Sequence, residues 1–144
     1  MQTLKNLKFF IVDDDPFSRM LYRQHLLNLG YKNNLLFENG RDCISKLDMQ
    51  PDLVILDYDM LPDNGIEVLR MIKKYNPNIP LLVISAVNDK RVAMDAIKYG
   101  AIDYVIKGER DLEMISKAIN NIENNICDPV DSETFIADFA TANV

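Results

Sequence analysis

The sequence predicts an α/β fold in which a five-stranded parallel sheet carries helices on both faces. Two observations predict this doubly wound arrangement. Short apolar runs alternate five times with longer segments of helical period, and strict alternation of this kind leads to a parallel sheet because right-handed crossovers leave few other arrangements. Most of the apolar runs also lack polar alternation, as expected of strands covered on both faces.

The five apolar runs are the expected strands. Most of them are rich in Val, Ile, Leu and Phe, which favour strands. They cover Leu7–Val12, Asn34–Phe37, Leu53–Leu56, Pro80–Ile84 and Asp103–Ile106. The second run gives the weakest signal of the five and fits an edge strand.

Five segments between and after these runs are expected to be helices. They cover Pro16 to Leu29, Gly40 to Met49, Gly65 to Tyr75, Asp89 to Tyr99, and a last segment that begins near Asp111. Pro16 suits a first helical turn, Asp89 can cap a helix N-terminus, and Gly30 and Gly100 suit C-terminal stops. The last segment spaces Leu112, Ile115, Ile119, Ile122 and Ile126 as one buried stripe.

Length and composition indicate one soluble domain. The chain has 144 residues, 48% hydrophobic and 26% charged, which fits one domain with a short extension. We expect the domain over residues 1–126 and a short, partly disordered tail over residues 127–144, because Pro129 should break the last helix. Cys43 and Cys127 have no nearby partner motif, so we expect reduced thiols.

Charge and hydropathy exclude several function classes. The formal charge is −6 and no run of Lys or Arg appears, which argues against direct nucleic-acid binding because phosphate contacts need clustered cations. No stretch of about 18 apolar residues and no signal-peptide core occur. We therefore expect a cytoplasmic protein without a membrane contact.

Polar side chains gather where the predicted strands end. The strand ends carry Asp13 and Asp14, then Asp57 and Asp59, then Ser85, and finally Lys107. Because the functional crevice of such a sheet lies beyond the C-terminal ends of its strands, we expect these groups to lie close together. Asp15, just before Pro16, is better explained as a helix cap.

This set of groups suits phosphoryl chemistry. Neighbouring carboxylates repel one another unless a cation joins them, and oxygen ligands without His or Cys suit Mg²⁺. A carboxylate beside that ion can attack phosphorus and form an acyl phosphate. The charge on the transferred group can then be balanced by Mg²⁺, by Lys107 and by the Ser85 hydroxyl.

The same residues, in the same order, resemble the receiver domain of bacterial two-component response regulators over about residues 6–126. The matching motifs are Phe-Phe-Ile-Val-Asp13-Asp14-Asp, Leu-Val-Ile-Leu-Asp57, Gly65, Val-Ile-Ser85-Ala and Asp-Tyr104-Val-Ile-Lys107. The resemblance is to the chemotaxis-type, single-domain members. It implies a flavodoxin-like sheet of strand order 2-1-3-4-5.

The resemblance also implies the role of each site residue. It implies Asp57 as the phosphoacceptor, Lys107 and Ser85 as catalytic groups, Ser85 and Tyr104 as switch residues, and a Mg²⁺ site made of Asp13, Asp14, Asp57 and the backbone carbonyl of Asp59. A sensor histidine kinase or histidine phosphotransfer protein would be the donor. Phosphorylation would change the surface of the fourth helix, fifth strand and fifth helix that a downstream effector binds. Such a protein catalyses its own phosphorylation and dephosphorylation and is not a turnover enzyme.

Two positions depart from the family pattern. The usual Met-Pro is Met60-Leu61-Pro62, and the usual Lys-Pro is Lys107-Gly108. A cis peptide without proline would cost about 2.5–4 kcal/mol, whereas glycine permits unusual backbone angles. We expect the placement of Lys107 to be kept.

Two alternatives remain open from the sequence. The first is a small phosphatase of the haloacid-dehalogenase type, with Asp57 as nucleophile and Asp59 as general acid, although its acidic metal pair should come last in the chain and here comes first. The second is a phosphorylation-independent, receiver-like binding module. His25, the only histidine, is expected to be a solvent-facing helix residue. The residues do not name the kinase, the effector or the pathway, and they are compatible with a phosphorylation-dependent dimer.

Overall fold

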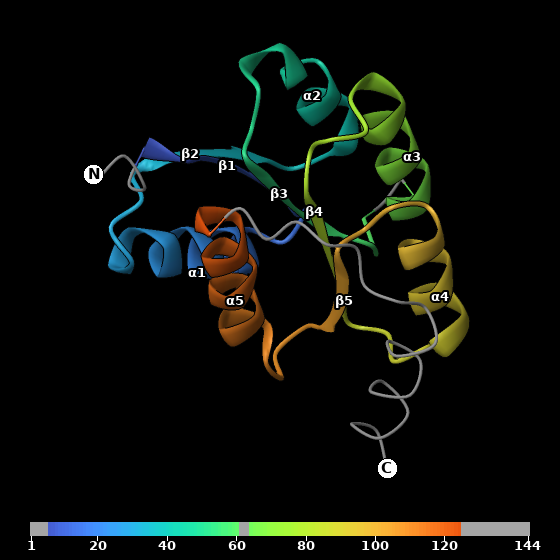
Figure 1. The fold of residues 1–144 in the computed structure, drawn as a ribbon. Coiled ribbons are helices and arrows are strands. Elements are labelled where there is room, and N and C mark those ends of the chain that lie inside the picture. Colours follow the sequence, from blue (N-terminus) through green and yellow to red (C-terminus); the bar gives the residue numbers. More distant parts are fainter. Residues whose placement is uncertain (1–5, 61–63, 125–144) are drawn as a thin grey trace.

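The computed structural model describes residues 6–60 and 64–124 and places five strands and five α-helices in alternation (Figure 1). The strands are β1 (Lys8–Val12), β2 (Asn33–Phe37), β3 (Leu53–Asp57), β4 (Leu81–Ser85) and β5 (Asp103–Ile106). The helices are α1 (Pro16–Asn28), α2 (Gly40–Ile44), α3 (Gly65–Tyr75), α4 (Lys90–Lys98) and α5 (Asp111–Glu123).

All the strands are parallel, in the order β2-β1-β3-β4-β5. The predicted fold class and strand order are therefore confirmed. Strand β2 lies at one edge, as its weak apolar signal suggested, and only its last residue, Phe37, is buried. Strands β3 and β4 lie in the interior of the sheet, and all ten of their residues are buried.

Alternate residues of each strand face two separate hydrophobic cores. On one face, residues such as Phe10, Val54 and Val83 pack with apolar residues of α2, α3 and α4. On the other face, Phe9 and Ile55 pack with residues of α1 and α5. Figure 1 shows α1 and α5 on one side of the sheet and the other three helices on the opposite side.

Short polar side chains cap four of the five described α-helices, and two of these caps, Asp15 and Asp89, are the ones that the sequence predicts. Asp15 accepts a hydrogen bond from the backbone N–H of Phe17 at the start of α1, and Asp89 accepts one from Arg91 at the start of α4. These contacts satisfy N–H groups that have no partner inside the helix. The cap assigned to Asp15 is confirmed.

Glycine ends two helices as predicted. Gly30 and Gly100 have φ values of 98° and 109°, in the left-handed region that glycine adopts without a steric penalty. Both predicted stop positions, after α1 and after α4, are confirmed.

Two local predictions are wrong. The continuous helix expected from Gly40 to Met49 ends at Ile44 and is followed by a separate 3₁₀ turn, Leu47–Met49, which Gln50 closes with a positive φ of 59°. His25 is half-buried, and its Nε2 lies 2.8 Å from the Ser116 hydroxyl of α5. It therefore contacts another helix and does not simply face solvent.

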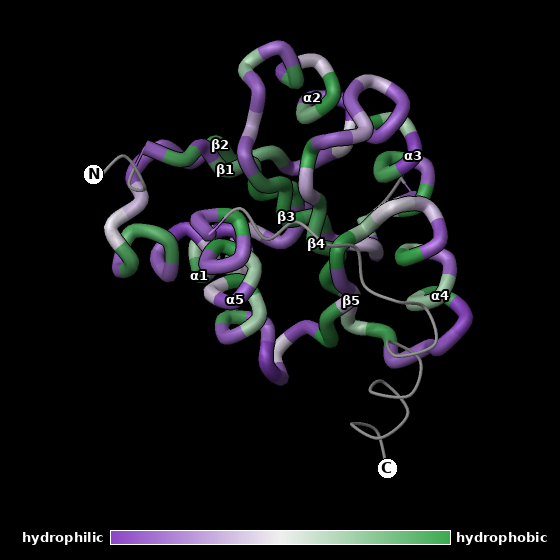
Figure 2. The backbone as a smooth tube through the Cα atoms, in the orientation of Figure 1, coloured by the Kyte–Doolittle hydropathy of each residue, from purple (hydrophilic) through white to green (hydrophobic). Residues whose placement is uncertain are grey.

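Hydropathy follows the layers of the fold. In Figure 2 the strands at the centre of the sheet are hydrophobic, and hydrophilic residues recur along the helices. Within residues 6–60 and 64–124, no helix is long and apolar enough to cross a bilayer. Cys43 is a free, buried thiol whose pKa burial raises to about 12, as expected of a reduced core cysteine. Cys127, Ile126 and the predicted domain boundary at 126 lie outside the described residues.

Candidate phosphoryl-transfer and metal site

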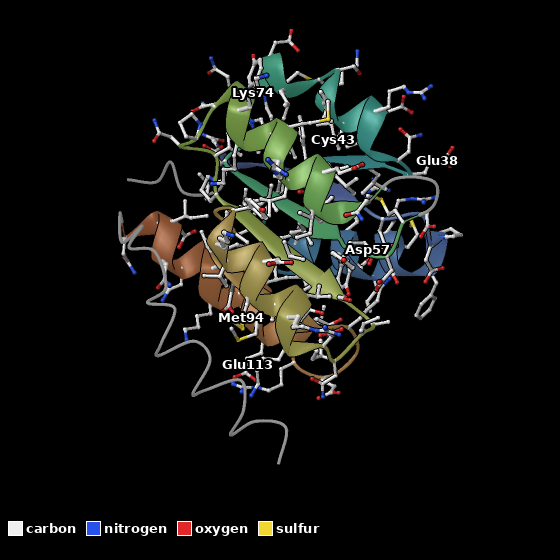
Figure 3. The ribbon with its side chains drawn as sticks, turned by 90° about the vertical axis from the view of Figure 1, so that its right-hand side faces the viewer. Glu38, Cys43, Asp57, Lys74, Met94 and Glu113 are labelled. Atoms are coloured by element: carbon white, nitrogen blue, oxygen red, sulfur yellow. The ribbon has the colours of Figure 1, made fainter. Side chains whose placement is uncertain are left out.

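Three carboxylates meet at the C-terminal edge of the sheet. Asp13 and Asp14 directly follow β1, and Asp57 is the last residue of the neighbouring strand β3. Each offers one carboxylate oxygen, and these atoms lie within 4.8 Å of one another. Figure 3 labels Asp57 at the end of the strands, where several oxygen atoms gather. The predicted convergence of these three residues is confirmed.

Lys107, directly after β5, brings a positive charge to the cluster. Its Nζ lies 2.9 Å from Oδ2 of Asp13 and 3.8 Å from Oδ2 of Asp57. The two carboxylate side chains are only 2% and 3% exposed, so water screens these ion pairs weakly. One ammonium next to three carboxylates still leaves an excess of negative charge.

Asp57 is the group that this environment perturbs most clearly. Burial, followed by the charge of Asp13, raises its pKa from 3.8 to about 7, although Lys107 and the backbone N–H of Asp59 act in the opposite direction. Burial disfavours the ionised form because a charge loses hydration. A carboxylate that titrates near neutral pH at a strand end is typical of a functional site.

The loop after Lys107 differs from the usual Lys-Pro of the family pattern. Gly108 has a φ of 84°, which proline cannot adopt because its ring fixes φ near −65°. The backbone N–H of Gly108 donates to Oδ2 of Asp111 at 3.0 Å, and the N–H of Lys107 donates to the Ser85 carbonyl at 2.7 Å. Glycine thus supports a different turn, and Lys107 still reaches both carboxylates.

Ser85, the last residue of β4, is bound to the side chain of Asp59. The Ser85 hydroxyl donates to Oδ2 of Asp59 at 2.9 Å, and the backbone N–H of Ala86 donates to the same oxygen at 3.0 Å. The backbone N–H of Asp59 in turn donates to Oδ1 of Asp57 at 3.3 Å. Ser85 is therefore connected to Asp57 through Asp59.

Tyr104 points inward. Its side chain is 4% exposed, and its hydroxyl donates to the carbonyl of Val87. The N–H of Val87 donates to the Ser85 hydroxyl oxygen at 3.0 Å. Burial raises the pKa of Tyr104 to about 12, so it remains a neutral donor. The two predicted switch residues are thus linked through one loop residue.

The loop between β3 and α3 is held close to the site by Gly65. Its N–H donates to the carbonyl of Tyr58 at 3.2 Å, and a Cβ built on Gly65 would lie 2.5 Å from the Cα of Tyr58. Only glycine allows this close approach of two backbones. Leu61 and Pro62, where the chain departs from the family pattern, lie outside the described residues.

The donor set fits Mg²⁺. The cluster offers oxygen atoms only, with a surplus of negative charge beside a buried Asp13 oxygen whose charge partner is Lys107. Mg²⁺ prefers one or two carboxylates together with water and phosphate oxygens. Asp13, Asp14 and Asp57 are the residues that would hold it.

Sequence reasoning gave the side chain of Asp59 a role only in the phosphatase alternative, as general acid. Asp59 was expected to contribute its backbone carbonyl, whereas its carboxylate accepts both the Ser85 hydroxyl and the Ala86 N–H. The sequence did contain a signal for a role of this side chain at the site, because Asp59 follows the predicted phosphoacceptor Asp57 by only two residues. The direction of its side chain depends on how β4 lies beside β3, which the sequence does not specify.

Comparison with known proteins agrees with this geometry. The response regulator receiver domain model matches residues 9–120. The chemotaxis protein CheY of Thermotoga maritima is 32% identical over 116 residues, which are 80% of this chain and 96% of that protein. The transcriptional regulatory protein ZraR of Escherichia coli is 37% identical over 106 residues, 73% of this chain and 24% of that longer protein.

Solved structures share the fold. The receiver domain of the Francisella response regulator 1452 superimposes with a TM-score of 0.75 at 21% identity, covering 83% of this chain and 98% of that one. The CheX–CheY–BeF3–Mg²⁺ complex from Borrelia burgdorferi gives a TM-score of 0.73 at 22% identity, covering 79% and 87%. A receiver is a signalling domain, which argues against the phosphatase alternative. The sheet order, the acidic cluster with Lys107 and the sequence match together place this chain in the response regulator receiver domain family.

Proposed function

We propose that Asp57 accepts a phosphoryl group from a phosphohistidine of a sensor histidine kinase or a histidine phosphotransfer protein. The observation that carries this proposal is the placement of Asp57, which is buried beside Asp13 and Asp14 and lies 3.8 Å from the ammonium of Lys107. Phosphoryl transfer depends mainly on positioning and charge stabilisation. This site supplies both.

In the proposed step, a carboxylate oxygen of Asp57 forms a bond to phosphorus. The bond from phosphorus to the donor's imidazole nitrogen breaks, and its electron pair stays on the imidazole. Lys107 neutralises charge on the phosphoryl oxygens, and the Ser85 hydroxyl donates to another of them. Bound Mg²⁺ would supply further positive charge to those oxygens and to the carboxylates. Attack of water on the acyl phosphate would later release inorganic phosphate and restore Asp57.

The first helix suits the docking of a protein donor. Phe17, Met20 and Leu21 are 73%, 54% and 38% exposed, and α1 begins directly after the acidic residues of β1. Exposed apolar side chains beside a reactive group are typical of a protein contact. We expect Phe17→Ala to slow transfer from a phosphorylated protein donor and to leave phosphorylation by acetyl phosphate unchanged.

The output of the switch would run through Ser85, Val87 and Tyr104. When the Ser85 hydroxyl exchanges its acceptor for a phosphoryl oxygen, Val87 moves with Ser85 because its N–H stays bonded to the Ser85 oxygen. Tyr104 follows through its bond to the Val87 carbonyl, and this movement alters the surface of α4, β5 and α5. Moving such an equilibrium from 1:99 to 99:1 needs about 5.5 kcal/mol of differential binding. A downstream effector, or a second copy of the chain, would recognise the altered surface. The proposed location remains the cytoplasm, where kinases of this class act.

The test is the intact mass of the protein after incubation with acetyl phosphate and Mg²⁺, beside an Asp57→Ala variant. We expect one phosphoryl group that requires Mg²⁺ and is absent from the variant. If none accumulates, beryllofluoride binding separates a fast-resetting switch from an inactive site. Absence of both phosphorylation and beryllofluoride binding would refute the proposal and favour the phosphorylation-independent binding module.

A further inference from the structure

The carboxylate of Asp59 lies between the phosphoacceptor strand and the switch serine. One of its oxygens, Oδ2, accepts two hydrogen bonds from the end of β4, at 2.9 Å from the Ser85 hydroxyl and 3.0 Å from the Ala86 N–H. An anionic oxygen with two convergent donors is a strong arrangement, because hydrogen bonds to charged groups are about twice as strong as those between neutral groups.

The two donors that Asp59 binds lie next to Asp57, where a phosphoryl group would need them. Asp59 follows Asp57 by two residues, and its N–H donates to Oδ1 of Asp57. Strand β4 pairs with β3 so that Ile84 lies opposite Asp57. Ser85 and Ala86 therefore come next to Asp57 at the edge of the sheet, where an oxygen of a phosphoryl group on Asp57 would need donors.

We propose that Asp59 is a positioning residue that acts as an internal competitor of the phosphoryl group. Its carboxylate holds the Ser85 hydroxyl and the Ala86 N–H in the unphosphorylated protein, and it must leave both donors before a phosphoryl oxygen can bind them. This inference rests on the proposed function of Asp57, which it deepens by naming a residue that weakens phosphoryl binding at that site.

The surroundings of Asp59 allow the exchange. Asp59 is an exposed residue, so its side chain can turn into water and regain hydration at small cost. Its backbone contact with Asp57 need not break when the side chain turns. The Ser85 oxygen meanwhile keeps its bond from the N–H of Val87, which holds the hydroxyl near a new acceptor.

The test compares beryllofluoride binding in Mg²⁺ by the wild-type protein with binding by Asp59→Ala, Asp59→Asn and the control Asp95→Ala. Asp95 is an exposed carboxylate of α4, and its removal changes net charge without touching Ser85 or Ala86. Because Asp59→Ala lacks the competing charged acceptor, it should bind beryllofluoride about tenfold or more tightly than the wild type. Asp59→Asn, which keeps an acceptor oxygen without charge, should fall between Asp59→Ala and the wild type. The control should match the wild type.

A second measurement examines the contact without any ligand. In ¹⁵N-labelled protein free of Mg²⁺ and phosphate, the amide proton of Ala86 should move upfield in Asp59→Ala and stay in place in Asp95→Ala, because a hydrogen bond to a carboxylate deshields the proton. This readout does not depend on phosphorylation. It also shows whether the variant is folded.

The outcomes separate this inference from the proposed function. If the wild-type protein binds beryllofluoride and Asp59→Ala binds it with equal or lower affinity, the competitor role is overturned and the proposed function stays intact. Equal tightening by Asp59→Ala and Asp59→Asn would also overturn it, because charge alone would then account for the effect. If Asp59→Ala binds beryllofluoride and the wild type does not, both the competitor role and the proposed function are supported. If neither the wild type nor Asp59→Ala binds it, both are overturned. An unchanged Ala86 amide proton would overturn the contact itself.

Discussion

Replacement of Asp57 by asparagine is expected to stabilise the metal-free protein. Asp57 is 3% exposed and lies beside a second buried carboxylate, Asp13. Ionising it inside the fold costs free energy, because burial and the charge of Asp13 outweigh the attraction of Lys107. Asparagine has nearly the same shape and removes this cost. The stability lost by the wild type is the consequence of keeping an acidic nucleophile in a buried site.

The magnitude follows from the pKa of Asp57, about 7 in the fold against an ordinary value of 3.8. Between these values the native protein binds more protons than the unfolded chain, so the free energy of unfolding falls as pH rises through this window. The full difference corresponds to about 4 kcal/mol at 1.36 kcal/mol for each pH unit. Local relaxation and water penetration reduce such costs, and we expect Asp57→Asn to gain about 1–3 kcal/mol at pH 8.

Urea denaturation in EDTA, followed by far-UV circular dichroism, measures this gain. Circular dichroism is preferred because the chain has no tryptophan. The gain should be largest at pH 8 and shrink as pH falls from about 7 toward 3.8, below which Asp57 is protonated in both the native and the unfolded state. Asp95→Asn, the same change on the exposed face of α4, should alter stability by less than about 0.5 kcal/mol. Addition of Mg²⁺ should stabilise the wild type more than the variant. A variant that is no more stable than the wild type at pH 8 would refute the electrostatic reasoning.

Three further substitutions test the contacts that hold the site. Lys107→Met should abolish beryllofluoride binding and raise the pKa of Asp57 further, because it removes the cation that lies 2.9 and 3.8 Å from two buried carboxylates. Tyr22→Phe should cost about 1.5–3 kcal/mol in urea denaturation, since its hydroxyl donates to Oδ2 of Asp111 at 2.7 Å beneath the Lys107 loop. Gly65→Ala should cost about 1–3 kcal/mol from overpacking, because the new Cβ would meet backbone at 2.5 Å.

A specific result would contradict each of these three predictions. Wild-type beryllofluoride affinity in Lys107→Met would mean that the ammonium does not hold the ligand. Unchanged stability in Tyr22→Phe would mean that the hydrogen bond from Tyr22 to Asp111 contributes no net stability. An unchanged urea midpoint in Gly65→Ala would mean that the loop before α3 moves aside freely.

Much of the site followed from sequence because strand ends are predictable. Continuous apolar runs predict buried parallel strands, and the C-terminal ends of such strands meet at one edge. Asp13, Asp57 and Lys107 could therefore be brought together without coordinates, and the structure confirms it. The strand order was implied only by the resemblance, because alternation of strands and helices fits several orders.

The break in the second predicted helix shows where local sequence patterns stop predicting the structure. Gly40 to Met49 has helical composition, yet the chain turns after Ile44, and Gln50 adopts a positive φ before β3. Tertiary packing of Cys43 and Leu47 in the core decides that turn. Likewise, His25 reaches Ser116 only because α1 and α5 pack on the same face of the sheet.

The sequence by itself determined the fold class, the family and the side chains that gather at the sheet edge, because spacing and order along the chain carry that information. Only the tertiary structure decided which donor meets which acceptor. Asp59 could have faced solvent, but the adjacent β4 supplies the Ser85 hydroxyl and the Ala86 N–H, which direct its carboxylate toward them. Hydrogen bonds require distance and angle to within a few tenths of an ångström, and only the packed sheet sets these.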